Sequence, residues 1–257
     1  MATGDWAGEG DPAHGGAGVF GAVPGQVLIK VEFGTLIWSE PTAGGGRAVM
    51  KMYRQRPFYD PARRLLITHR AAREFQLLSH LVRHGIPCSE PLSWSHGRHY
   101  LHGRYELLAT RQIADAATLE MLLQQPGAVA DLAPLFRLAR RMHDSGVSHG
   151  AFVPRNILVS FPVHGVPAFH VIDMAYSHIF PRGITGTRMA SFDLLELLYW
   201  IQRHVAPERC RAWLADYGLG ESETRGLMAR LERHRPGRPW RHLRRAETDL
   251  RAFIAGL

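Results

Sequence analysis

The 257-residue sequence contains few lysines and few cysteines, and it has no long hydrophobic run. Because no apolar stretch reaches about 18 residues, a typical membrane-spanning helix is excluded. The N-terminus lacks a basic start followed by an apolar stretch and therefore does not predict a secretory signal. Cys88 and Cys210 lie far apart in the sequence and show no metal-ligand spacing. We therefore expect a reduced, cytoplasmic protein rather than a disulfide framework or a cysteine metal site.

The scarcity of lysine makes the two lysines informative. The formal net charge is +8, and of the 31 basic side chains two are lysines, Lys30 and Lys51, while the other 29 are arginines. This bias is typical of GC-rich coding, so the net charge alone says little about a nucleic-acid, membrane or phosphorylated partner. Against an arginine background, a lysine indicates a position that needs a compact ammonium group instead of a planar guanidinium.

The first half of the chain has the pattern of a small sheet with one helix. Residues 1–25 are rich in Gly, Ala and Pro without periodicity, which predicts a flexible tail. Apolar residues at helical spacing predict a helix over roughly 61–84. Alternating apolar and β-branched residues predict strands over 27–33, 35–39, 48–53, 92–94 and 105–110, with a turn at Gly34 between the first two.

Beyond Gln112 the pattern becomes mainly helical. Helices are predicted over 117–124 and 129–144, and again from about Ser191 onward. Between them, a hairpin through Gly165 and Pro167 joins a strand that follows Asn156 to a strand that ends at Asp173, and the later helices break at Pro207, 218–220 and 236–239.

Four polar residues interrupt or end apolar stretches. Lys51 lies inside a predicted strand and Glu74 on the helix that follows it. Asn156 and Asp173 lie on the two strands of the predicted hairpin. A lysine can contact phosphates, a glutamate can orient the lysine, and an Asn–Asp pair offers the hard oxygen ligands that Mg²⁺ prefers. Each residue alone has an ordinary structural explanation, but their joint order favours a site for a nucleoside triphosphate and its metal.

The order of these residues resembles that of the protein-kinase-like superfamily. More narrowly, the chain is similar to the bacterial lipopolysaccharide kinase family, which phosphorylates Kdo or heptose sugars, over roughly residues 26–200. No single phrase is specific, but their order and spacing are. The phrases that carry the resemblance are AVMK at 48–51, REF at 73–75, HGA at 149–151, NILV at 156–159, VID at 171–173 and DLL at 193–195.

The resemblance implies an α+β, bilobal, protein-kinase-like fold. The N-lobe would comprise residues 26–109, with an antiparallel sheet plus one helix, and residues 110–113 would form the hinge. The mainly helical C-lobe would comprise residues 114–257, with basic helices at its end.

The resemblance also implies roles for individual residues, with ATP and Mg²⁺ as cofactors. Lys51 would contact the α- and β-phosphates and pair with Glu74, whereas Asn156 and Asp173 would hold the metal. His149 and Asp193 would support the catalytic loop. The hinge, whose backbone would bind adenine, would consist of Thr110, Arg111, Gln112 and Ile113.

The sequence departs from the family pattern at three points. The catalytic aspartate lies five residues before the magnesium asparagine in the family, and here that position is Ala151. Only Gly34 is present where a glycine-rich phosphate loop is expected, and the interval from Asp173 to Asp193 is short for a regulated protein kinase. The short interval favours a small-molecule or glycan acceptor.

Three functional hypotheses remain open at this stage. The first is ATP-dependent phosphorylation of a sugar hydroxyl on lipopolysaccharide core or a related glycolipid, slowed because a missing general base costs roughly 10²–10⁴ in rate. The second, favoured by Ala151, is an ATP-binding pseudokinase that acts as a scaffold for a partner. The third is a small-molecule kinase of the aminoglycoside or choline type, against which the missing aspartate counts equally.

The C-terminal region carries a basic cluster. Its default interpretation is a solvated helix face. The alternative is a peripheral contact with the anionic inner membrane, where each cation is worth about 1 kcal/mol. No nucleic-acid recognition motif accompanies the cluster, so no nucleic-acid partner is expected. The sequence does not identify a protein partner. The cluster consists of Arg230, Arg233, His234, Arg235, Arg238, Arg241, Arg244 and Arg245, with Trp240 among them.

Overall fold

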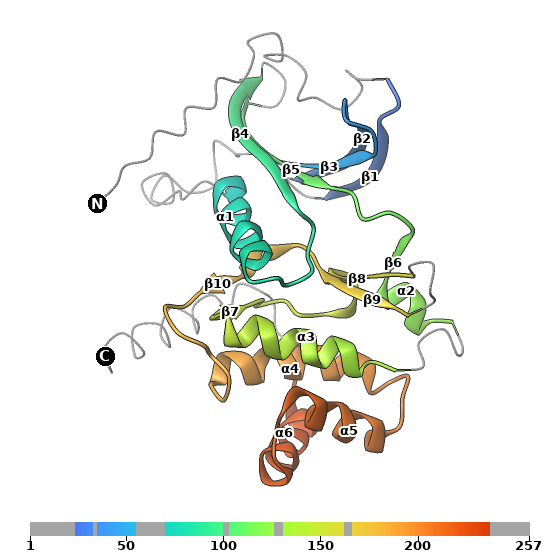
Figure 1. The fold of residues 1–257 in the computed structure, drawn as a ribbon, viewed down its shortest axis with the longest axis vertical. Helices are drawn as coiled ribbons and strands as arrows, with labels where there is room; N and C mark the ends of the chain where they lie inside the picture. Colours follow the sequence, from blue (N-terminus) through green and yellow to red (C-terminus); the bar gives the residue numbers. More distant parts are fainter. Residues whose placement is uncertain are drawn as a thin grey trace. The chain divides into compact units, whose positions relative to one another are not determined.

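A computed structural model describes residues 24–32, 35–54, 70–99, 103–125, 131–161 and 166–236 (Figure 1). The described residues fall into two compact units, which divide between Ala71 and Ala72, between Pro91 and Leu92, and between Gln112 and Ile113. Most of the predicted tail, the turn at Gly34, the Gly165 turn and the basic residues from Arg238 onward lie outside the described residues. The lobe boundaries expected from the sequence stay predictions.

The first unit is built on a five-stranded sheet with the strand order β1-β2-β3-β5-β4. The pairs β1–β2, β2–β3 and β3–β5 are antiparallel. Between β2 and β3, the chain turns through Gly45 and Gly46, both at positive φ, which glycine adopts without a Cβ penalty. The strands are β1 (Val27–Glu32), β2 (Thr35–Pro41), β3 (Arg47–Arg54), β4 (Pro91–His99) and β5 (Gly103–Arg111).

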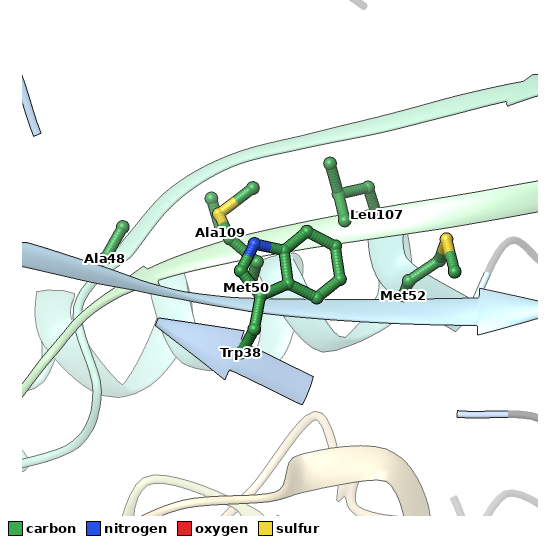
Figure 2. Close-up of a cluster of buried hydrophobic side chains, with 6 residues drawn as sticks. All are labelled: Trp38, Ala48, Met50, Met52, Leu107 and Ala109. Carbon is green, nitrogen blue, oxygen red and sulfur yellow. The ribbon is translucent and has the colours of Figure 1, made fainter. Parts of the chain in front are cut away.

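One face of this sheet carries a hydrophobic core. Figure 2 shows its side chains, which come from alternate positions of β2, β3 and β5 and therefore lie on the same side. The largest member, Trp38, is fully buried, and its indole nitrogen donates to Glu40 at 2.9 Å. Lys51 lies on the opposite face of the central strand β3 from this core. The core consists of Trp38, Ala48, Met50, Met52, Leu107 and Ala109.

The second unit combines helices with two small sheets. The three-stranded sheet has the order β6-β8-β9, and the two-stranded sheet pairs β10 with β7. Helix α1 begins two residues before this unit. The helices are α1 (Arg70–Arg83), α2 (Leu119–Leu123), α3 (Ala133–Asp144), α4 (Arg188–Ile201), α5 (Pro207–Tyr217) and α6 (Glu221–Arg233). The strands are β6 (Ala116–Thr118), β7 (Val147–Ser148), β8 (Ile157–Ser160), β9 (Ala168–Val171) and β10 (His178–Ile179).

Local chemistry explains where several helices begin and end. The side chain of Asp131 accepts from the backbone N–H of Ala133 at 2.9 Å, which satisfies one of the N–H groups that have no helical partner at the start of α3. Pro207 opens α5, where its missing N–H costs no helical hydrogen bond. Gly218 ends α5 at a φ of 97°.

The helix predicted over 117–124 is wrong in its first residues. Residues 116–118 form β6, which pairs with β8, and the helix α2 begins only at Leu119. Thr118 explains the boundary because its hydroxyl accepts from the backbone N–H of Met121 at 3.2 Å and caps the helix. The helix predicted from 129 begins at Ala133, and residues 61–69 of the first predicted helix lie outside the described residues. The α+β class predicted from the sequence is confirmed.

Candidate active site

A tight loop between β7 and β8 is the centre of the candidate site. It is held by Asp193 of α4, which is fully buried. One carboxylate oxygen of Asp193 accepts from the backbone N–H of His149 at 2.7 Å, and the other accepts from that of Gly150 at 2.8 Å. The hydroxyl of Ser148 and a ring nitrogen of His143 also contact this carboxylate, at 3.0 and 3.2 Å. Asp193 therefore holds the backbone of this loop, and its support of a catalytic loop stays a prediction.

The carboxylate of Asp193 stays ionised in this setting. Burial alone would raise its pKa, but the hydrogen bonds that the carboxylate accepts from His143 and from the backbone N–H of His149 hold the pKa below its ordinary value. An ionised acceptor makes stronger hydrogen bonds to backbone N–H groups than a neutral one does. The loop is thus held by charge-assisted bonds.

Gly150 is required by the shape of the loop. Its φ is 72°, and a Cβ added there would lie 2.4 Å from the backbone oxygen of Tyr176. A side chain at this position would therefore displace either the loop or the segment that carries Tyr176.

His149 braces the loop from inside. Its Nε2 lies 3.0 Å from the backbone oxygen of Ile172, and because a carbonyl can only accept, Nε2 carries the proton. Nδ1 is buried without a hydrogen-bond partner among the described residues. Burial lowers the pKa of His149, although Asp193 and Asp173 oppose this, so the ring is neutral. The ring therefore joins this loop to Ile172, and its support of a catalytic loop stays a prediction.

The backbones of Asn156 and Asp173 lie close together at the open end of the β8–β9 hairpin, away from its turn. We call this end the hairpin mouth. The backbone N–H of Ile172 donates to the oxygen of Asn156 at 3.0 Å, and Ile157 pairs with Val171 in the adjacent register. The side-chain NH₂ of Asn156 donates to the backbone oxygen of Ala151 at 2.9 Å, so this contact does not use the side-chain oxygen. Asp173 lies in the left-handed region with a φ of 59°. Such strain in a non-glycine residue often occurs at functional sites.

These two side chains fit Mg²⁺ better than a transition metal. They offer one amide oxygen and one carboxylate, which are hard ligands. Among the described residues, no group of three or more His, Cys, Asp or Glu side chains could hold a metal ion by themselves. Mg²⁺ commonly takes one or two protein oxygens and completes its shell with water and phosphate oxygens.

Glu74 of α1 contacts the segment directly after Asp173. Its side chain is buried, and one carboxylate oxygen accepts from the backbone N–H of Met174 at 3.1 Å. The helix that carries the predicted phosphate-site glutamate therefore also fixes the backbone next to the predicted metal ligand. The pairing of Glu74 with Lys51 stays a prediction.

Lys51 occupies the middle of β3 in the first unit. It lies opposite Ile37 of β2 and Leu108 of β5. Its ammonium group is 5.2 Å from the centre of the Tyr53 ring, on the same face of the sheet. A lysine on a central strand, flanked by paired strands on both sides, has a firmly placed backbone.

The predicted hinge residues follow the end of β5. Thr110 is buried, Arg111 is the last residue of the strand, and Gln112 donates its backbone N–H to Arg47 at 2.9 Å. The division between the two units falls between Gln112 and Ile113. Binding of adenine by this segment stays a prediction.

The position of the expected catalytic base carries no acid. Ala151 is buried, and the residues from Phe152 to Pro154 that follow it are apolar and buried as well. Arg155 is exposed and cannot accept a proton. This part of the loop therefore offers positioning without a general base.

Four residues that shape the site were not predicted from the sequence. His143 joins Asp193 to Tyr217 of α5, whose hydroxyl lies 2.7 Å from the other ring nitrogen of His143. Arg73 and Ser177 contact each other next to Glu74 and Met174. Arg73 lies within the phrase REF at 73–75, but no role was predicted for it, and nothing local marked Ser177 or Tyr217.

Comparison with known proteins identifies the family. The sequence model of the lipopolysaccharide kinase (Kdo/WaaP) family matches residues 38–212, which is more than half of the chain. The chain belongs to this family. The match includes Lys51, Glu74, Asn156, Asp173 and Asp193. Among curated proteins, no sequence matches this chain significantly.

The WaaP structure supports the kinase-like fold. The structure described as "WaaP in complex with acyl carrier protein" matches with a TM-score of 0.61 and 17% identity, covering 80% of this chain and 86% of that chain. The Rio2 kinase from Chaetomium thermophilum matches with a TM-score of 0.49 and 18% identity, covering 81% of this chain and 73% of that chain. The predicted family and the predicted kinase-like fold are both confirmed.

The described part of this lipopolysaccharide kinase family member contains no helix that is long and apolar enough to cross a membrane.

Proposed function

We propose that this protein binds ATP and Mg²⁺ and transfers phosphate slowly to a sugar hydroxyl of lipopolysaccharide core or a related glycolipid. The observation that carries the proposal is the hairpin mouth, where Asn156 and Asp173 offer oxygen ligands beside a loop fixed by Asp193. Membership of the lipopolysaccharide kinase family supports the acceptor class.

Each residue would have a defined task. Lys51 would hold the α- and β-phosphates, and Glu74 would orient it. Asn156 and Asp173 would hold Mg²⁺, which when bound neutralises charge on the transferring phosphate. The hinge from Thr110 to Ile113 would bind adenine. These tasks concern positioning and charge, which supply most of the catalysis in phosphoryl transfer.

Slow transfer follows from Ala151. Without a base, the acceptor hydroxyl must lose its proton to water or to a group of the acceptor itself. General-base assistance is typically worth roughly 10²–10⁴ in rate. The loss therefore slows the reaction without removing nucleotide binding.

The first test is nucleotide binding, measured by thermal shift with ATP and Mg²⁺. A charged contact between Lys51 and a phosphate is worth about 1.5–3 kcal/mol, so Lys51→Met should weaken binding by about 10- to 100-fold. Lys30→Met, on the exposed strand β1, removes the other lysine and should leave the affinity unchanged. Equal affinities for wild type and Lys51→Met would contradict the assigned role of Lys51.

The second test is transfer of labelled phosphate to extracted core oligosaccharide. Binding without any transfer would favour the second candidate function, a pseudokinase scaffold, which Ala151 specifically supports. The scaffold would then act through a partner. Because the similar WaaP structure is a complex with acyl carrier protein, a pull-down with purified acyl carrier protein is a direct first assay for such a partner.

A peripheral membrane contact through the basic C-terminal cluster is part of the proposal. Arg230, Arg233 and Arg235 are exposed in the described part of this cluster. Sedimentation with vesicles that contain anionic lipid should carry the protein down at low salt and release it as salt rises. Equal sedimentation with neutral vesicles would contradict an electrostatic contact.

A further inference from the structure

Two neighbouring residues of α1 hold the segment that follows Asp173. The carboxylate of Glu74 accepts from the backbone N–H of Met174, as described above. The guanidinium of Arg73 donates to the backbone oxygen of Ser177, and the same nitrogen lies 3.4 Å from Nε2 of His178. One turn of one helix thus contacts both ends of a five-residue segment.

Ser177 passes this contact on to the catalytic loop. It is fully buried, and its hydroxyl donates to the backbone oxygen of His149 at 2.9 Å. His149 in turn donates its backbone N–H to Asp193. A continuous hydrogen-bonded path therefore runs from Arg73 through Ser177 to the loop that Asp193 fixes.

The segment is also folded on itself. The backbone N–H of Ser177 donates to the oxygen of Met174 at 3.1 Å, closing the short 3₁₀ turn Met174–Tyr176. Because the turn begins directly after Asp173, we expect a shift of Ser177 to move the turn and to change where the Asp173 carboxylate lies relative to Asn156. The left-handed backbone of Asp173 needs such support because the surrounding structure must offset its strain.

We propose that Arg73 is a positioning residue that sets metal affinity by fixing Ser177, and through it Asp173 and the catalytic loop. This inference rests on the proposed function for its metal readout. It goes beyond that function because it couples the position of α1 to the geometry of the metal site. Residues that orient metal ligands without touching the metal typically change metal affinity 10- to 100-fold when altered.

The first experiment measures the Mg²⁺ concentration that gives half of the ATP-induced thermal shift. Arg73→Met should raise it about tenfold while leaving metal-free ATP binding unchanged. Arg73→Lys keeps one donor for Ser177 and should recover part of the loss. Arg83→Met removes an exposed arginine from the same helix and is the matched control. Equal weakening of ATP binding with and without Mg²⁺ would overturn the proposal, because it would indicate general damage.

The path through Ser177 has its own test. Ser177→Ala removes the hydroxyl that contacts His149 but keeps the carbonyl that Arg73 binds. If the two contacts act in series, Arg73→Met and Ser177→Ala should each raise the Mg²⁺ requirement, and the double variant should add little to either. Fully additive effects would overturn a shared path.

A ligand-free measurement separates failure of this inference from failure of the proposed function. Hydrogen exchange of the unliganded protein should quicken about tenfold over residues 174–178 and 149–150 in Arg73→Met, with α5 unchanged. Exchange that quickens only within α1 would overturn the proposal that Arg73 holds residues 174–178 and the catalytic loop in place. If wild type binds no ATP at all, the proposed function fails. The exchange result alone then decides whether Arg73 holds this segment and the loop in place.

Discussion

Ala151 carries a methyl group at the position where the family pattern has the catalytic aspartate. The backbone oxygen of Ala151 accepts from Asn156, so the position of the residue is already tied to the predicted metal ligand. A carboxylate on the same Cα would start from a backbone that this hydrogen bond already holds. The gain in rate from such a carboxylate then depends on whether an acceptor hydroxyl comes within its reach.

Ala151→Asp should therefore raise the rate of phosphate transfer by an order of magnitude or more. The measurement is initial-rate transfer of labelled phosphate to core oligosaccharide under saturating ATP and Mg²⁺. Ala151→Asn has nearly the same shape but cannot accept the proton, so it should give no gain. An equal gain from both variants would assign the effect to packing. No gain from Ala151→Asp in a folded protein would mean that the acceptor lacks a productive pose.

At the scale of elements, α3, α4 and α5 meet at one buried polar cluster. His143 of α3 contacts Asp193 of α4 with one ring nitrogen and Tyr217 of α5 with the other. Burial raises the pKa of Tyr217 to about 12, so its hydroxyl stays protonated and can donate to His143. The three helices are therefore joined by hydrogen bonds as well as by apolar packing, and the loop anchor Asp193 belongs to the same cluster.

Tyr217→Phe should destabilise the protein by about 1–3 kcal/mol, because it leaves a buried nitrogen of His143 without its partner. For a protein of this size, that corresponds to a fall of about 2–12 °C in Tm. Tyr199→Phe on α4 loses a hydroxyl that accepts from Arg203 at the surface, and it should cost less than about 1 kcal/mol. Similar Tm values for the two variants would contradict the importance of the buried contact.

The elements also show what local sequence pattern can and cannot predict. Strands and helices with a clear period were predicted to within a few residues because the pattern itself reflects which face is buried. Residues 117 and 118 were predicted to be helical because their pairing with β8, some 40 residues further along the chain, leaves no local signal. Polar contacts of the site between residues that are distant in the sequence likewise leave no local signal.

The Asn156–Asp173 pair was predictable because the two residues end adjacent strands of one hairpin. The contact of Arg73 with Ser177 spans 104 positions, and that of His143 with Tyr217 spans 74. Such contacts depend on how the helices pack, which periodicity does not describe. The functional hypothesis therefore followed from the motif residues, whereas the residues that hold them in place became visible only in the structure.

Over the whole molecule, the buried titratable groups predict sensitivity to acid. Burial, with a smaller contribution from Arg73, lowers the pKa of His178 to about 4, although Asp193 opposes this. Burial also lowers the pKa of His80, His149 and His170. The neutral form of each of these rings is favoured in the folded state, whereas in the unfolded chain each ring takes up a proton near its ordinary pKa of 6.5.

The free energy of unfolding should therefore fall as the pH is lowered. A histidine whose pKa is lowered on folding contributes its full stability above about 6.5 and loses it as the pH falls toward the folded value. For His178 the window is pH 6.5 to about 4, and the loss is on the order of 3 kcal/mol at most. The lowered pKa of Asp193 acts in the same direction at still lower pH, because its stabilising ionised form is lost there.

The measurement is Tm as a function of pH between 7.5 and 4, compared between wild type and His178→Gln. Glutamine cannot titrate but can still accept from Arg73, so the variant should lose less stability on acidification while remaining folded at pH 7. His204→Gln replaces an exposed histidine after α4 and should follow the wild-type curve. Parallel curves for all three proteins would show that His178 is as readily protonated when folded as when unfolded. Its ring would then be solvated, and the contact with Arg73 would not persist in solution.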